Sequence, residues 1–147
     1  MSQLRNPAII AFVAILTAGN SYAATLWMTD DDLRATFTGQ KIMGHYTNGK
    51  KFNEEFRRDG TLTYIDVRRQ NTGRWSISND SFCTIYDADP LGGCYQVARV
   101  GSNCFEFYFI ARTKQQAEKP EDRTKPSWTA RAWLSQNEPT CEDESFV

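Results

Sequence analysis

The chain has 147 residues, of which 24% are charged and 40% hydrophobic, and its formal net charge is −1. A chain of this length fits one domain, and a charge so close to zero excludes the basic surface of a nucleic-acid-binding protein. His45 is the only histidine and the sequence has no Cys-x-x-Cys spacing, so neither a metal nor a cofactor is expected.

The first 23 residues resemble a cleavable signal peptide. A single positive charge, Arg5, precedes the apolar run from Ala8 to Leu16, and the small residues Ser21 and Ala23 suit a signal-peptidase site. The apolar run has about half the roughly 20 residues that a membrane-spanning helix needs, so no membrane anchor is expected. We therefore predict an exported protein, periplasmic or secreted, with residues 24–147 as its single domain.

Residues 30–38 are predicted to form a short helix. Thr29 is a suitable N-cap, three aspartates follow it in the first turn, and Thr29 and Asp32 have the spacing of a capping box. Leu33 and Phe37 lie one turn apart, and Gly39 can end the helix. We expect this helix to plug or cover one end of the domain.

From residue 41 onward the pattern predicts β-strands and turns. Asn48-Gly49 is typical of a two-residue hairpin turn in which both positions have positive φ, and that register places His45 opposite Phe52.

A three-residue loop at Arg58-Asp59-Gly60 is predicted for the next turn. It pairs Phe56 with Leu62 and Glu54 with Tyr64, which keeps the apolar side chains on one face.

Later strands are predicted at 74–78, 82–86, 94–100, 104–112 and 128–134, with an exposed, proline-containing loop at 113–127. About eight short antiparallel strands joined by tight turns favour an all-β fold, either a single small barrel or a sandwich, because open sheet edges invite aggregation. A barrel of that size is just wide enough for its own side chains, so we expect a packed interior.

Two disulfides are predicted from the four cysteines, Cys83, Cys94, Cys104 and Cys141, because an even number in an exported chain indicates a disulfide framework. Of the three possible connectivities we favour Cys83–Cys94 with Cys104–Cys141, since Cys83 and Cys94 lie on the two strands that flank loop 87–93.

Part of the chain is similar to small exported alphaproteobacterial proteins of unknown function. The matching pieces are Leu33…Phe37-Thr38-Gly39, Gly44, Phe56…Asp59-Gly60, Gly73-Arg74-Trp75-Ser76-Ile77, Phe82-Cys83 and Cys94-Tyr95-Gln96-Val97. This resemblance implies export and a compact β domain, and it supplies no functional residues. The Gly-x-Trp piece also resembles a strand of lipocalins and avidins, which are calycin-like barrels, although in those families it stands near the start.

Two groups of residues are candidate binding sites. The first is a basic group that gives residues 50–74 a local net charge of +3 and would suit an anionic partner, unless its members only guard strand ends: Lys50, Lys51, Arg57, Arg58, Arg68, Arg69 and Arg74. The second is an aromatic pocket lined by Tyr64, Trp75 and Tyr108.

Candidate catalytic groups are few. His45 is the one imidazole that could act as a base. Glu54 or Glu55 could pair with Asp66 as in glycosidases. Adjacent strand residues point to opposite faces, however, and nearby arginines suggest that both glutamates form exposed ion pairs.

The sequence therefore predicts a non-enzymatic binding protein of the cell envelope whose partner is an unknown protein or small molecule. The alternative is an inhibitor of a hydrolase, a lysozyme or a protease, that uses loop 87–93 or loop 113–127. An enzyme that uses His45 ranks third.

Overall fold

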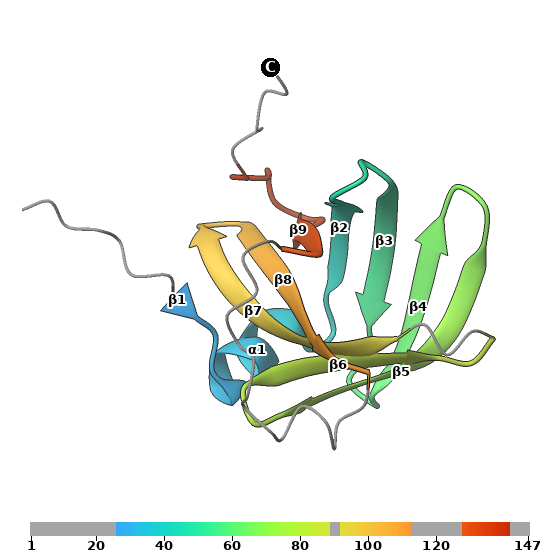
Figure 1. The fold of residues 1–147 in the computed structure, drawn as a ribbon, viewed down its shortest axis with the longest axis horizontal. Helices are drawn as coiled ribbons and strands as arrows, with labels where there is room; N and C mark the ends of the chain where they lie inside the picture. The colour runs from blue at the N-terminus through green and yellow to red at the C-terminus, as the bar shows by residue number, and fades with distance from the viewer. Residues whose placement is uncertain (1–25, 89–91, 113–127, 142–147) are drawn as a thin grey trace, which may run out of the picture.

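The predicted series of strands and turns forms a β-barrel with one short helix (Figure 1). The computed structural model describes residues 26–88, 92–112 and 128–141. Its elements in chain order are β1 (Leu26–Trp27), α1 (Asp30–Phe37), β2 (Lys41–Tyr46), β3 (Lys51–Phe56), β4 (Thr61–Asp66), β5 (Gln70–Ser78), β6 (Ser81–Tyr86), β7 (Gly93–Gly101), β8 (Cys104–Ala111) and β9 (Ala130–Leu134).

The eight strands from β2 to β9 close into an antiparallel barrel. Each strand pairs with the next along the chain, and β9 pairs with both β8 and β2, which closes the sheet. Of the two predicted folds, the barrel is therefore correct and the sandwich is not. The two-residue strand β1 was not predicted from the sequence. It pairs with β7 at Ala98 and Arg99, whereas the pairing of β6 with β7 ends at Tyr95.

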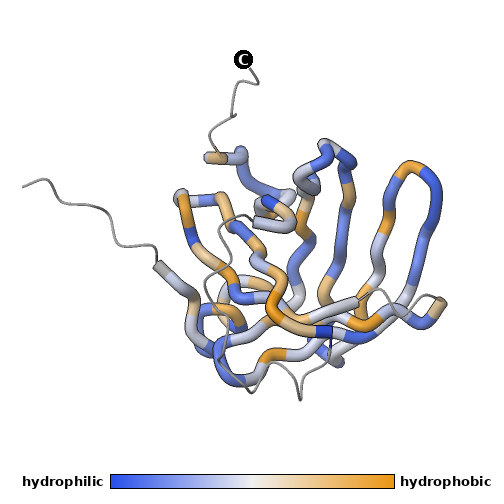
Figure 2. Tube along the Cα trace, viewed as in Figure 1, coloured by the Kyte–Doolittle hydropathy of each residue, from blue (hydrophilic) through white to orange (hydrophobic). Residues whose placement is uncertain are grey.

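Alternation of side chains places the apolar residues inside the barrel. The predicted register of β3 and β4 is confirmed, with Phe56 opposite Leu62 and Glu54 opposite Tyr64. Figure 2 shows hydrophobic and hydrophilic residues interspersed along β7 and β8. Phe105 and Phe107 point inward from β8 into the buried core.

The Asn48-Gly49 turn differs from the prediction. The N–H of Tyr46 donates to the carbonyl oxygen of Lys50 at 3.0 Å, and only Gly49 has a positive φ, 77°. The loop thus has three residues, Gly44 faces Phe52, and His45 faces Lys51. A Cβ on Gly44 would lie 2.7 Å from the Phe52 ring, so this register is possible because residue 44 has no side chain.

Two further turns follow the patterns of known hairpins. Gly60 has φ 83° in a three-residue loop, as predicted. Asn79 and Asp80 form the two-residue turn with both φ positive, 52° and 55°, between the paired Ser78 and Ser81.

Helix α1 plugs one end of the barrel. The predicted capping box is present, with the Asp32 N–H donating to Thr29 Oγ1 at 3.3 Å and the Thr29 N–H donating to Asp32 Oδ2 at 3.0 Å. Leu33 and Phe37 are fully buried. The Phe37 ring packs edge-on against Phe82 and Phe105, with centroids 5.3 and 5.2 Å away. We call this the closed end.

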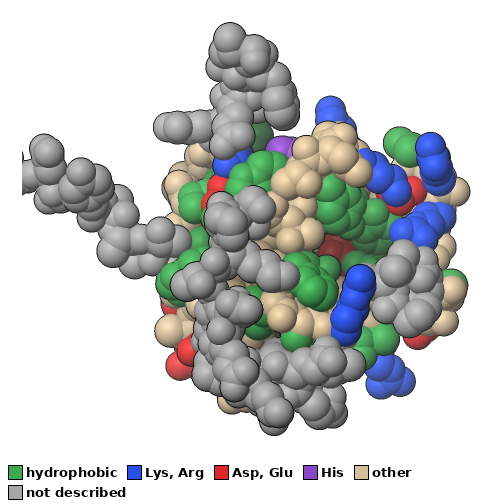
Figure 3. Space-filling view, viewed as in Figure 1, with side chains coloured by type: hydrophobic (Ala, Val, Ile, Leu, Met, Phe, Trp, Pro, Cys, Tyr) green, Lys and Arg blue, Asp and Glu red, His purple; other side chains and the backbone are tan. Residues whose placement is uncertain are grey.

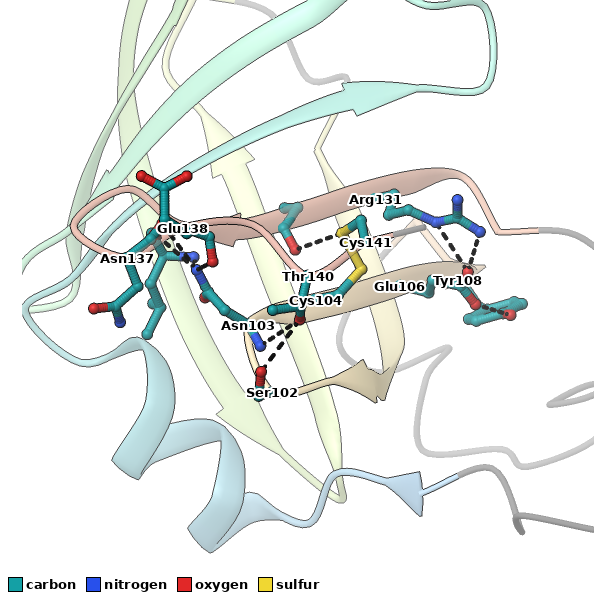
Figure 4. Close-up of a disulfide and its surroundings, with 12 residues drawn as sticks. Ser102, Asn103, Cys104, Glu106, Tyr108, Arg131, Asn137, Glu138, Thr140 and Cys141 are labelled. Carbon is teal, nitrogen blue, oxygen red and sulfur yellow. Dashed lines mark hydrogen bonds and ion pairs between the residues drawn. A yellow bond between two sulfur atoms is a disulfide. The ribbon is translucent and has the colours of Figure 1, made fainter. Parts of the chain in front are cut away.

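Both favoured disulfides are present, Cys83–Cys94 and Cys104–Cys141. Cys83 and Cys94 are directly opposed on β6 and β7 and form a second, smaller buried cluster with Ala111. Cys104–Cys141 ties the segment after β9 to the start of β8 (Figure 4).

Asn103 fixes the same segment. Its Nδ2 atom donates to the carbonyl oxygens of Leu134, Asn137 and Glu138 at 3.0 to 3.2 Å.

Within the described ranges, no helix has the length and apolar character needed to cross a membrane.

Candidate functional site

The end of the barrel opposite α1 is hollow, and we call it the mouth. Its cavity has a volume of about 400 Å³, and its walls come from six strands and the segments next to them: Tyr46, Lys50, Tyr64, Arg69, Asn71, Tyr86, Tyr95, Phe109, Arg112 and Thr129. Figure 3 shows a hollow bordered by hydrophobic and basic side chains, with acidic atoms at its floor. The expected packed interior is therefore correct for the closed end only.

A smaller space of about 30 Å³ lies deeper in the barrel. It shares Tyr46, Tyr86 and Tyr95 with the mouth cavity, and Glu54, Phe52 and other side chains complete its lining. Ligand sites of small molecules are commonly concave, aromatic and equipped with a few polar groups. The two spaces together have that character.

Four tyrosines converge on the mouth because of where they stand in their strands. Tyr46 and Tyr86 are the last residues of β2 and β6, and Tyr64 and Tyr95 lie near the corresponding ends of β4 and β7. The Tyr46 hydroxyl donates to the Tyr64 hydroxyl at 3.4 Å. Burial raises the pKa of Tyr95 to about 12 and the pKa values of Tyr46 and Tyr86 further above the usual value. The phenols are therefore neutral at physiological pH.

Glu54 lies below these tyrosines. It occupies an inward position in the middle of β3 and is only 7% exposed. The Tyr86 hydroxyl donates to its Oε1 atom at 2.6 Å. Burial raises the pKa of Glu54 to about 7, although the Tyr86 hydrogen bond opposes that shift. Glu54 is thus an acid that changes its charge near neutral pH inside a cavity.

Three basic side chains, Lys50, Arg69 and Arg112, line the mouth. The Asp66 Oδ2 atom lies 2.8 Å from Lys50 Nζ and 3.6 Å from Arg69 Nε. Asp66 Oδ1 also accepts the N–H of Arg68 at 2.8 Å. The hydrogen bond from Lys50, together with the others, holds the pKa of Asp66 well below its usual value. Among the described residues that line the mouth, three therefore carry a positive charge, and Asp66 contacts two of them, Lys50 and Arg69.

The three residues predicted to form an aromatic pocket are not brought together. Tyr64 lines the mouth. Trp75 lies at the closed end, where its Nε1 donates to the carbonyl oxygen of Arg57 at 2.9 Å and its ring stacks on Phe82. Tyr108 points away from Phe107 to the outside of β8, against Trp27. The prediction of that pocket is wrong, because it ignored the depth and direction of each side chain.

The predicted basic group is also divided. Successive hairpin turns lie at opposite ends of the barrel, so a cluster in sequence becomes two groups in space. The mouth end has Lys50, Lys51, Arg68 and Arg69, and the closed end has Arg57, Arg58 and Arg74. The prediction of a single basic patch is therefore wrong, and only part of the basic group lies at the candidate site.

The candidate catalytic residues are separated in the same way. His45 points outside the barrel, with its ring centroid 5.5 Å from that of Trp128. Glu55 also points outward and pairs with Arg57 at 3.3 Å, as expected. Glu54 is not an exposed partner of an arginine, which corrects that expectation. Glu54 and Asp66 both face inward, but the Asp66 side chain has no exposed area left for a substrate.

Sequence reasoning missed Tyr46, Tyr86 and Tyr95 as site residues, and it considered Glu54 as a catalytic carboxylate but then assigned it to an exposed ion pair. A signal for Glu54 exists in the sequence, because it stands at an alternate position between Phe52 and Phe56 and so belongs to the apolar, inward face. The tyrosines carry a weaker signal, since each lies near the end of its strand that points to the mouth.

Several expectations fall outside the described residues: the signal peptide at 1–23, the loop at 113–127, and residues 89–91 of the loop at 87–93.

No family model, no curated protein and no solved structure matches this chain.

Proposed function

We propose that this chain is an exported, non-enzymatic binding protein of the cell envelope, and that its ligand is a small molecule held in the mouth of the barrel. The observation that carries the proposal is the mouth cavity of about 400 Å³ above the buried carboxyl of Glu54. Small-molecule sites have volumes of roughly 300 to 1,000 Å³. Two disulfides suit an oxidising compartment, which supports a periplasmic or secreted location.

The rest of the barrel supports a binding role because it makes the mouth rigid. Its walls are paired strands, and Phe37 fills the closed end. A site that is already in its bound shape loses little conformational entropy when the ligand enters. The polar groups at the mouth are tyrosine hydroxyls, amides and charged side chains, which orient a ligand through hydrogen bonds.

Blocking the mouth tests the proposal. Asn71 lines the cavity, and Asn53 is exposed on the outer face of β3. We expect native mass spectrometry of the protein, isolated from its own cell envelope, to show a bound small molecule. That mass should be lost in Asn71→Trp and kept in the matched control Asn53→Trp. A protein that carries no ligand and takes up none from an extract of its host contradicts the proposal, as does equal binding by both variants.

Inhibition of a hydrolase is the second candidate. Cys83–Cys94 joins the two strands that flank loop 87–93, and a loop whose flanking strands are joined would suit an inhibitor because its binding costs less entropy. Assays against lysozyme and serine proteases distinguish the two functions. An inhibitor should act equally well with and without Asn71→Trp, whereas a mouth-binding protein should inhibit none of these enzymes.

A further inference from the structure

We infer that the ligand of the mouth is an elongated zwitterion, whose primary ammonium group reaches Glu54 while its anionic group lies at Lys50, Arg69 and Arg112. This inference rests on the proposed function and names the class of ligand. It follows from three observations: the acceptor at the floor, the cations at the rim, and the distance between them.

The floor of the cavity suits a cation that donates hydrogen bonds. Tyr86 supplies one hydrogen bond to Oε1 of Glu54, and a carboxylate can accept about four. Among the described residues, no lysine or arginine forms an ion pair with Glu54. An ammonium group would supply the missing positive charge.

The walls above Glu54 favour the same kind of group. The rings of Tyr46, Phe52, Tyr86, Tyr95 and Phe107 line the inner space, and aromatic rings attract cations. That space of about 30 Å³ exceeds the roughly 10 to 15 Å³ that one water-sized group requires, so it can take a primary ammonium group.

The rim of the cavity suits an anion. Lys50, Arg69 and Arg112 are the basic side chains among the described residues that line the mouth. Asp66 is already engaged by Lys50, by Arg69 and by the Tyr64 hydroxyl at 3.2 Å. An incoming carboxylate or phosphate can therefore contact the basic side chains that line the mouth.

The register of the strands gives the length of the ligand. Glu54 is opposite Tyr64, Asp66 is two residues farther along β4, and Lys50 is four residues before Glu54. At about 3.4 Å per residue along the strands, the rim begins roughly 7 Å from Glu54 and ends roughly 14 Å from it. A ligand with both charges on one carbon cannot reach both groups.

Four compounds of eight carbons separate the elements of this inference. In 8-aminooctanoate the nitrogen and the carboxylate are about 10 Å apart when the chain is extended. Its isomer 2-aminooctanoate has the same atoms with adjacent charges, octanoate has only the anion, and octylamine has only the cation. Isothermal titration calorimetry of the oxidised protein at pH 8 measures the four affinities.

We expect 8-aminooctanoate to bind at least about tenfold more tightly than each of the other three, because a hydrogen bond to a charged group contributes a factor of about 10 to 100. Glu54→Gln should weaken binding of 8-aminooctanoate and octylamine about tenfold or more without affecting octanoate. Arg112→Gln should weaken 8-aminooctanoate and octanoate without affecting octylamine. Glu55→Gln, on the outer face of the same strand, is the matched control and should change none of these affinities.

The outcomes separate this inference from the proposed function. If octanoate binds as tightly as 8-aminooctanoate, or if Glu54→Gln leaves the affinity of 8-aminooctanoate unchanged, the zwitterion is ruled out while a ligand in the mouth is retained. If none of the four compounds binds but the isolated protein carries a ligand that Asn71→Trp removes, the inference is again overturned and the proposed function stands. If the isolated protein carries no ligand and nothing binds, both fail.

Discussion

The hydroxyl of Tyr86 on β6 donates a 2.6 Å hydrogen bond to the carboxyl of Glu54 on β3, across the inside of the barrel. The two strands are separated in the sheet by β4 and β5, so the bond joins facing parts of the wall rather than neighbours. It places an ionisable group under the mouth and fixes the direction of its carboxyl. Two predictions follow from this pair.

Glu54 should make the stability of the protein decrease as pH rises. Its pKa is about 7 in the folded chain against 4.5 for an ordinary glutamate, so between these values the folded state holds more protons and unfolding becomes easier with rising pH. Glu54→Gln removes this cost. Relative to the wild type, we expect the variant to gain about 3 kcal/mol of unfolding free energy between pH 4 and pH 8. Urea unfolding at the two pH values measures the gain. The prediction is contradicted if variant and wild type differ in unfolding free energy by the same amount at pH 4 and pH 8.

Tyr86→Phe should raise the pKa of Glu54 above 7, because the Tyr86 hydroxyl stabilises the ionised carboxylate. A ¹³C NMR titration of the glutamate carboxyl carbons measures the pKa. Tyr108→Phe is the matched control: its hydroxyl also donates a 2.6 Å hydrogen bond to a glutamate, Glu106, but on the outside of the barrel. The control should leave the pKa of Glu54 unchanged. An equal shift of that pKa in both variants would show that the Tyr86 hydrogen bond does not cause the shift.

Asp66→Asn should destabilise the protein most at neutral pH. Lys50 and the N–H of Arg68 lower the pKa of Asp66 in the folded chain, so its contribution is complete above the unfolded value of about 4 and is lost as pH falls through the lower, folded value. We expect the melting temperature of the variant to lie below that of the wild type at pH 7 and to approach it below pH 3. Thermal scans over this range measure the difference. A difference in melting temperature that grows as the pH falls would contradict the prediction.

Phe37→Ala should remove the plug of the closed end. Phe37 is fully buried and contacts four other phenylalanine rings, so we expect a loss of about 3 to 5 kcal/mol in unfolding free energy. Asp31→Ala, on the exposed side of the same helix, should cost less than about 1 kcal/mol. Chemical denaturation compares the two. Similar losses in both variants would mean that the helix contributes through its backbone alone.

Removal of the disulfides should have unequal effects. Replacing both members of a pair by serine should cost about 3 kcal/mol for Cys83–Cys94 and about 4 kcal/mol for Cys104–Cys141, because the second pair closes a loop of 38 residues and the first a loop of 12. Guanidinium unfolding of the two double variants measures the order. A reversed order would show that the outer contacts of Cys83–Cys94 outweigh the difference in loop length.

Much of the fold could be predicted because its signals are local. The capping box at Thr29, the glycine of the Gly60 loop and the alternation of Phe105 with Glu106 each depend on a few neighbouring residues. The two-residue strand β1 is too short for any such pattern. The prediction for the Asn48-Gly49 turn was wrong because the dipeptide fits more than one hairpin loop. The observed register pairs Phe52 with Gly44, where an added side chain would collide with the Phe52 ring.

The site was harder to predict because it depends on all eight strands together. A pocket requires that side chains point inward and lie at the same depth. The alternation of β8 already places Tyr108 on the face opposite to Phe107, and the position of Trp75 near the Gly60 loop places it at the closed end. The depth of Tyr95 also depends on a bulge between Cys94 and Tyr95, which no sequence pattern marks.

The plug at the closed end has a consequence for how such a protein can change. Phe37 fills that end from a helix outside the sheet, and the rings packed around it come from the half of each strand that is distant from the mouth. A residue such as Asn71, which lines the mouth, can therefore vary with little effect on folding, and each variation alters which molecules fit. The same barrel could acquire new selectivities by substitutions at one end alone, while the other end preserves the scaffold.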